Sequence, residues 1–314
     1  MIGTQNPDAG IDDTARVDLV EVGVRDGLQN ESVTIPTAGK AELIERLVAA
    51  GSRRLEVASF VHPARVPQMA DAEAVIDAIG PSPRGVSYIG LVLNRRGLER
   101  ALATSVDEIN FVVSASNGFN QANAGVSPET TMTEIEMMLG QVDDRRTTVT
   151  ISVAFGCPYD GSVPVDAVVE LAARASNAGA GEIALGDTIG VAVPSQVTSV
   201  IEAVAAAVDV PLRGHFHDTR NTAVANAAAA HAAGVAVLDA SVGGTGGCPF
   251  APNATGNVAT EDLMYLFERM GIETGLDHER IIETTRWLEL LLGKKLPSAV
   301  ARAGWWRPDE RHEI

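Results

Sequence analysis

The sequence contains few cysteines, few cationic side chains and no long apolar run, and each shortage excludes a class of protein. Cys157 and Cys248 are the only thiols in 314 residues, too few for a disulfide framework and typical of a reducing cytoplasm. No run of about 18 apolar residues is present, so we expect no membrane span. Lysine and arginine number 24 against 41 aspartate and glutamate residues, a net charge of −17, which argues against nucleic-acid binding through phosphates.

The N-terminal segment 1–15 carries Asp8, Asp12 and Asp13 and no apolar core. This composition predicts a short disordered start rather than a signal peptide. In the chain as a whole 46% of the residues are hydrophobic, enough for a large buried core.

Short runs rich in Val and Ile alternate with Ala-rich helical patterns along the chain. The sequence predicts strands at 17–24, 53–58, 86–93, 108–113, 148–154, 181–186, 211–216 and 236–242. Helices are predicted between them near 37–50, 70–79, 95–104, 128–142, 164–178, 194–207 and 219–233, with a last one at about 259–271. Strict alternation indicates parallel strands with crossover helices, and this number of units favours a closed (β/α)8 TIM barrel.

Local signals support this interpretation. Ser127-Pro128 and Val193-Pro194 are typical helix starts, and glycines stand where three helices should end, at Gly51, Gly179 and Gly234. The segment after the first strand lacks the G-x-G-x-x-G spacing common in open doubly wound sheets. We therefore expect a TIM-barrel domain at 16–271 and a helical C-terminal extension at 272–314. The sequence leaves open whether Trp305-Trp306 covers a barrel face or forms a subunit contact.

Active sites of such barrels lie at the C-terminal ends of the strands, so polar residues there are the candidates. They are Arg25 and Asp26 after the first strand, Glu56 in the second, Asp187 after the sixth, and His215 and His217 in the seventh. Alternate strand residues share a face, so the two imidazoles can converge on one cation. Ring closure places the eighth strand beside the seventh and the first, which gathers Asp26, both histidines and the loop after the eighth strand on one arc.

Each candidate also has a structural interpretation. Asp26 could cap the turn that follows it. Glu56 faces the barrel interior and needs a partner, so an ion pair with Arg25 is the alternative to catalysis. Asp187 could simply begin the next loop. Cys248 could be a small buried hydrophobe, although it lies among glycines.

Several motifs follow one another in a fixed order. They are Val20-Glu21-Val22-Gly23-Val24-Arg25-Asp26-Gly27-Leu28-Gln29-Asn30-Glu31, Gly156-Cys157-Pro158-Tyr159, Leu185-Gly186-Asp187-Thr188-Ile189-Gly190, His215-Phe216-His217-Asp218-Thr219, Gly246-Gly247-Cys248-Pro249-Phe250 and Gly256-Asn257-Val258-Ala259-Thr260-Glu261-Asp262. As a set they resemble the hydroxymethylglutaryl-CoA lyase family, metal-dependent lyases built on TIM barrels. Arg-Asp-Gly alone is shared with related synthases and aldolases, whereas the last two motifs narrow the resemblance to the lyases.

The resemblance implies a site and a chemistry. It implies a divalent cation, Mg²⁺ or Mn²⁺, held by Asp26, His215, His217 and Asn257. It also implies that Arg25 stabilises an enolate oxygen, that Cys248 is an acid or base on a mobile loop, that Glu56 and Asp187 support proton transfer, and that Gln29 lines the site. Either His215 or Asp187 would act as the base.

The implied substrate is an acyl-CoA, either 3-hydroxy-3-methylglutaryl-CoA or a close homologue, cleaved at a carbon–carbon bond. The alternative is a related aldolase or condensing enzyme acting on a 2-oxo acid with the same metal site. A homo-oligomer, dimer or larger, is also expected. The chain departs from the family pattern at Asn117, where Glu is usual, and at Arg220, where Tyr is common. Arg220 either meets a further carboxylate or the CoA phosphates, or begins the next helix.

Overall fold

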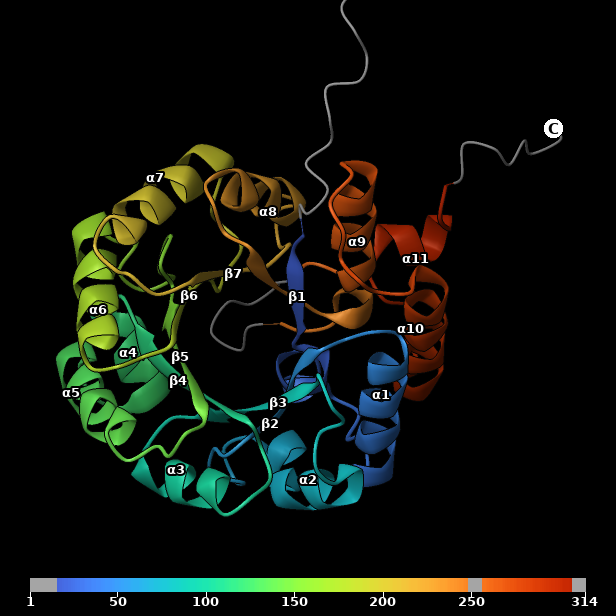
Figure 1. The fold of residues 1–314 in the computed structure, drawn as a ribbon, viewed down its shortest axis with the longest axis horizontal. Coiled ribbons are helices and arrows are strands. Elements are labelled where there is room, and N and C mark those ends of the chain that lie inside the picture. Colours follow the sequence, from blue (N-terminus) through green and yellow to red (C-terminus); the bar gives the residue numbers. More distant parts are fainter. Residues whose placement is uncertain (1–15, 248–255, 307–314) are drawn as a thin grey trace, which may run out of the picture.

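The computed structural model describes residues 16–247 and 256–306. Within them the strands form a closed parallel barrel in sequence order, from β1 round to β8, which pairs with β1 (Figure 1). The strands are β1 (Asp18–Glu21), β2 (Arg54–Ser59), β3 (Ser87–Val92), β4 (Glu108–Ser114), β5 (Arg146–Ser152), β6 (Glu182–Asp187), β7 (Leu212–Phe216) and β8 (Val237–Ala240). The predicted TIM barrel is therefore confirmed.

Helices surround the barrel (Figure 1). They are α1 (Thr37–Ala49), α2 (Ala72–Ile79), α3 (Arg95–Leu102), α4 (Asn117–Ala124), α5 (Pro128–Leu139), α6 (Val165–Asn177), α7 (Pro194–Ala205), α8 (Ala223–Ala232) and α9 (Thr260–Arg269), with 3-10 turns η2 (Pro67–Met69) and η3 (Val242–Gly244). The predicted start at Ser127 is confirmed, since its hydroxyl accepts from the Thr130 N–H at 3.2 Å. The glycines expected at helix ends have left-handed φ values, +101° at Gly51, +96° at Gly179 and +97° at Gly234.

Helix α4 is missing from the sequence prediction. Its sequence is rich in Asn and Gly, which have low helix propensity. The caps stabilise it instead. Ser116 Oγ accepts from the Phe119 N–H at 3.3 Å, and Gly125 ends the helix at φ +80°.

The C-terminal extension packs against the barrel helices. Its helices are α10 (His278–Leu292) and α11 (Ala299–Ala303), and α10 lies beside α1 and α9. Ile281 and Leu288 belong to the same hydrophobic core as the barrel. Trp305 stacks on His278 with ring centroids 4.4 Å apart and contacts Tyr265 of α9, so this ring covers the surface between α9 and α10. The predicted disordered start at 1–15 lies outside the described residues.

Among residues 16–247 and 256–306, no helix combines the length and the apolar character needed to cross a bilayer.

Charged side chains occupy the barrel interior at the N-terminal ends of the strands. Arg54, Glu108 and Glu182 are each the first residue of their strand and are all buried. Arg54 donates to Glu108 Oε1 and Oε2 at 3.0 and 2.6 Å and to both oxygens of Glu182 at 3.0 Å. Higher in the barrel, Arg213 Nε lies 3.5 Å from Glu182 Oε1 and 3.4 Å from Asp239 Oδ1. Buried charges are tolerated only when paired in this way.

The pKa of Glu182 reflects this pairing. Burial opposes ionisation, but Arg213 and Arg54 outweigh burial and lower the pKa of the carboxyl from 4.5 to about 2. The pKa of Glu182 is thus lower in the folded state than in the unfolded state. The ionised cluster therefore stabilises the fold above pH 4.5, and this contribution is lost as the pH falls through about 2.

Replacing Glu182→Gln should lower the free energy of unfolding by about 3–5 kcal/mol, because Arg54 and Arg213 would stay buried without their shared carboxylate. Urea unfolding at pH 7 measures this loss. Glu202→Gln, the same change at an exposed position of α7, is the matched control and should stay within about 0.5 kcal/mol of wild type. Equal losses in the two variants would contradict the importance of the interior cluster.

Candidate active site

The segment after β1 differs from its prediction. The strand was expected to reach residue 24 and to end in Arg25 and Asp26, but it ends at Glu21 and is followed by a π-helical turn, η1 (Gly23–Gly27). Glu21 causes the difference. Its buried carboxylate accepts from the N–H groups of Gly23 at 2.7 Å and Val242 at 3.0 Å, which pulls the chain out of the strand ladder.

Glycine at position 23 permits this contact, because an added Cβ would lie 2.6 Å from Glu21 Oε1 and the carboxylate would have to shift. The hydroxyl of Thr260 also donates to Glu21, at 2.7 Å. Burial nevertheless outweighs these hydrogen bonds and raises the pKa of Glu21 to about 7. The turn thus presents Arg25 and Asp26 to the C-terminal mouth of the barrel.

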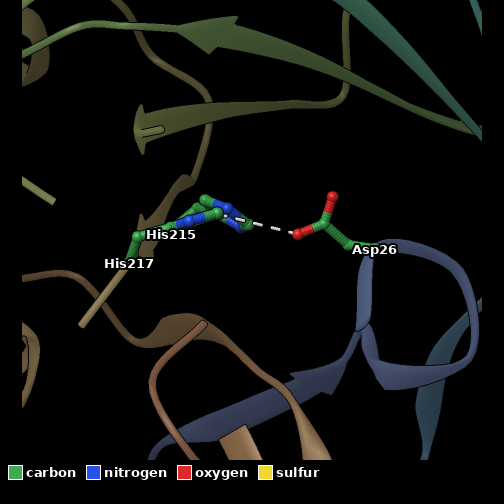
Figure 2. A group of neighbouring side chains, drawn as sticks. All are labelled: Asp26, His215 and His217. Carbon is green, nitrogen blue, oxygen red and sulfur yellow. Dashed lines mark ion pairs between the residues drawn. The ribbon is translucent and has the colours of Figure 1, made fainter. Parts of the chain in front are cut away.

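Asp26, His215 and His217 come together at that mouth. One potential ligand atom from each lies within 4.8 Å of the others. Figure 2 shows the two imidazole rings side by side and directed toward Asp26, with ring centroids 5.2 Å apart. His217 Nε2 lies 3.7 Å from Asp26 Oδ2. The predicted shared face of the two histidines is confirmed.

Asn257 joins this cluster from the segment before α9. It forms an antiparallel bridge with His217, and its Nδ2 donates to Asp26 Oδ2 at 2.8 Å. Its Oδ1 and the Nδ1 of His217 are buried and have no hydrogen-bond partner among the described residues. An unpaired buried polar atom costs about 1–3 kcal/mol, and coordination to a cation would remove such a cost at the Asn257 oxygen.

The donor set therefore fits a divalent metal. Carboxylate and amide oxygens with imidazole nitrogens suit Mg²⁺ or Mn²⁺. The structure brings together all four side chains expected as ligands, and metal binding by them remains a prediction.

Asp239 on β8 is a site residue that the sequence reasoning missed. His215 Nδ1 pairs with Asp239 Oδ2 at 2.9 Å, which leaves Nε2 for the cavity. Burial disfavours the charged imidazole, but this hydrogen bond and the charges of Asp239 and Asp26 outweigh it and raise the pKa of His215. A carboxylate behind an imidazole is the usual way to orient a metal-binding histidine. The sequence feature that could have identified Asp239 was an acidic residue between Leu238 and Ala240 inside a short strand.

Arg25 is paired on both sides. Its Nε donates to Glu56 Oε2 and its Nη1 to Asp26 Oδ1, both at 2.6 Å. Burial opposes the cation, but the charges of Glu56 and Asp26 outweigh it and raise the pKa of Arg25. The expected ion pair between Glu56 and Arg25 is thus present. Arg25 also lines the cavity described below, so the pair does not remove the guanidinium from the site.

Burial by itself would raise the pKa of Asp26. The pKa nevertheless falls well below its ordinary range. Arg25 and the two histidines together outweigh burial. Asp26 is therefore ionised at any pH near neutrality, as a carboxylate ligand must be.

The other candidates are placed differently. Both oxygens of Asp187 accept backbone hydrogen bonds, from Val191 at 2.9 Å and Ala192 at 3.0 Å, as the loop interpretation predicts. Asp187 is not among the residues lining the cavity, although its neighbours Gly186 and Thr188 are. Gln29 lines the cavity as expected. Cys248 lies outside the described residues.

Arg220 contacts the backbone of a neighbouring loop. It precedes α8, and its Nη1 donates to the carbonyl oxygens of Ile189 at 3.0 Å and Gly190 at 2.8 Å. Arg220 therefore ties down the loop that follows β6.

A cavity of about 460 Å³ joins these groups, within the usual size range of ligand sites. One wall carries Arg25, Asp26, His215 and His217. The facing wall, from β3, β4 and α4, includes the apolar side chains of Leu91 in β3, Leu93 after β3, Val112 of β4 and Phe119 of α4, beside the polar side chain of Asn110. The helix missing from the sequence prediction thus supplies part of the mouth.

The chain is similar to several lyases. The chain is 41% identical over 300 residues to the (R)-citramalyl-CoA lyase of Chloroflexus aurantiacus, covering 92% of this chain and 95% of that protein. It is 42% identical over 293 residues to the 3-hydroxy-3-isohexenylglutaryl-CoA/hydroxy-methylglutaryl-CoA lyase of Pseudomonas aeruginosa, covering 92% and 97%.

Among solved structures, an HMG-CoA lyase from Acinetobacter baumannii in complex with coenzyme A and 3-methylmalate matches with a TM-score of 0.90. It is 36% identical, and the match covers 95% of this chain and 98% of that one. The HMGL-like family matches residues 16–288. The expected resemblance is thereby confirmed, and the chain belongs to the HMGL-like family.

Proposed function

We propose that the protein is an acyl-CoA lyase. It cleaves 3-hydroxy-3-methylglutaryl-CoA, or a close 3-hydroxy-3-alkylglutaryl-CoA, to acetyl-CoA and acetoacetate or its homologue. The convergence of Asp26, His215, His217 and Asn257 beside Arg25 in one cavity carries this proposal. The names of the relatives at 41 and 42% identity support the substrate class. A homo-oligomeric state and a cytoplasmic location remain predictions from the sequence.

The four converging side chains would hold Mg²⁺ or Mn²⁺. When bound, such a cation lowers the pKa of a hydroxyl group that coordinates it. The chain then has to supply a base, and His215 is favoured over Asp187. Nδ1 of His215 is held by Asp239 and Nε2 is free, whereas both oxygens of Asp187 already accept backbone hydrogen bonds. Asp26, His217 and Asn257 would then hold the cation alone, and His215 would contribute to metal binding only while its Nε2 carries no proton.

Arg25 would stabilise the product side of the cleavage. Once the carbon–carbon bond breaks, negative charge develops on the thioester oxygen, and a fixed guanidinium nearby lowers the energy of that charge. Arg25 is held for this purpose by Glu56 and Asp26. Cys248 would then protonate the carbon, and the presence of the preceding Gly247 in the cavity lining supports this role.

The second candidate is a lyase that releases a 2-oxo acid. The citramalyl-CoA lyase of Chloroflexus aurantiacus is as similar to this chain as the hydroxymethylglutaryl-CoA lyases are. Citramalyl-CoA also carries a hydroxyl, a methyl group and a carboxylate, and the same cleavage would release pyruvate. The identity of the released acid separates the two functions.

Purified protein with Mg²⁺ should convert at least one 3-hydroxy-3-alkylglutaryl-CoA to acetyl-CoA and a 3-oxo acid. Mass spectrometry of the products, with (R)-citramalyl-CoA as a parallel substrate, measures this. Cys248→Ala and addition of EDTA are the controls and should each abolish most of the turnover. Pyruvate as the sole acid would favour the second candidate, and no turnover of any of these thioesters would exclude both.

Asp239→Asn should weaken metal binding about 10- to 100-fold, because the imidazole of His215 would lose the carboxylate that orients it. Calorimetric titration with Mn²⁺ measures the affinity without any substrate. Asp209→Asn, at an exposed position before β7, is the matched control and should bind Mn²⁺ like wild type. Unchanged affinity in Asp239→Asn would mean that His215 needs no such support.

A further inference from the structure

We propose that Asn110 of β4 is a positioning residue for Arg25, acting through Glu56. Asn110 lines the cavity, and only 3% of it is exposed. The proposal rests on the proposed function in one respect: it takes Arg25 to be the group that stabilises charge on the substrate. The contacts that support it are independent of the substrate.

A chain of hydrogen bonds crosses the barrel from β5 to the η1 turn. Thr150 Oγ1 donates to Asn110 Oδ1 at 2.8 Å. Asn110 Nδ2 donates to Glu56 Oε1 at 2.9 Å. Glu56 Oε2 in turn accepts from Arg25 Nε at 2.6 Å. Each link joins side chains of different elements, so the position of Arg25 depends on groups at three strands.

An amide is well suited to the middle of this chain. Its NH₂ group can face only an acceptor and its oxygen only a donor, so the carboxylate on one side and the hydroxyl on the other fix its orientation. Both ends of Asn110 are satisfied, which offsets the cost of burying an amide inside a barrel. No apolar side chain of the same size could hold the carboxylate.

The contact of Asn110 controls how Glu56 meets Arg25. Glu56 gives one oxygen, Oε2, to both Nε and Nη2 of Arg25, because the other oxygen is held by Asn110. Without Asn110, the carboxylate is free to turn and present both oxygens to the guanidinium in the bidentate geometry that this pair prefers. The guanidinium would then turn away from Asp26, to which its Nη1 now donates at 2.6 Å.

Asn110→Leu keeps the side-chain size and removes the amide. We expect kcat to fall about 10- to 100-fold with little change in KM, since a misdirected Arg25 affects charge development more than binding. Thr150→Val should lower kcat less, and the double variant should match Asn110→Leu alone, because Thr150 acts only through Asn110. Asn177→Leu at the end of α6 is the matched control and should keep the wild-type kcat.

A double-mutant cycle with Arg25 distinguishes a positioning role of Asn110 from a general distortion of the barrel. If Asn110 acts through Arg25, then Asn110→Leu should have no further effect on kcat in an Arg25→Met background. A loss of the same size in both backgrounds would overturn the proposal, because a distorted barrel would lower kcat whether or not Arg25 is present.

A third measurement needs no turnover. The Nε–H proton of Arg25 lies in a short, buried hydrogen bond, so its nitrogen NMR signal should be resolved and protected from solvent exchange in the wild type. In Asn110→Leu that signal should shift or exchange faster, while Asn177→Leu should leave it unchanged. An identical Arg25 signal in Asn110→Leu would overturn the proposal even if the thioester assay fails, so the two failures can be told apart.

Discussion

Buried charge has to be paired, and this requirement shapes the protein from the floor of the barrel to the mouth of its cavity. Arg54 pairs with two glutamates at the floor, and Arg213 connects one of them, Glu182, to Asp239. Asp239 then holds His215. Asp239, which orients His215, is thus the last member of an ion network that starts at the N-terminal ends of the strands. Site and fold share one set of interactions, so neither can change alone.

Two buried carboxyl groups at the rim bind backbone amides and hydroxyl groups instead of cations. Glu21 binds the N–H groups of Gly23 and Val242, and Glu261 of α9 accepts from the Gly243 N–H at 3.1 Å and from the hydroxyl of Thr285 on α10. Burial raises the pKa of Glu261 to about 8. These contacts fix both sides of the turn that leads toward Gly247. The C-terminal extension is therefore linked through Thr285 and Glu261 to the turn that follows β8.

Much of this arrangement follows from the order of elements. Alternating strands and helices predict the closed barrel, and closure brings Asp26, His215, His217 and the loop after the eighth strand to one rim. The resemblance, and not closure, indicated Asn257 in that loop, which lies 231 positions from Asp26. The π-helical turn could not be predicted, because it depends on Glu21 binding the amide of Val242, a contact across the closed ring. Asp239 was missed for the same reason, because its role depends on a contact with His215 on another strand. Helix α4 was missed because its caps, and not its composition, stabilise it.

The two walls of the cavity are under different constraints. The wall of β7, β8 and the η1 turn consists of paired charges, and changing one of them leaves a partner unpaired at a cost of several kcal/mol. The wall of β3, β4 and α4 includes the apolar side chains of Leu91, Leu93, Val112 and Phe119, where exchanges of similar volume usually cost about 1.5 kcal/mol or less. Selection for a different acyl branch can therefore act on the second wall while the first stays fixed.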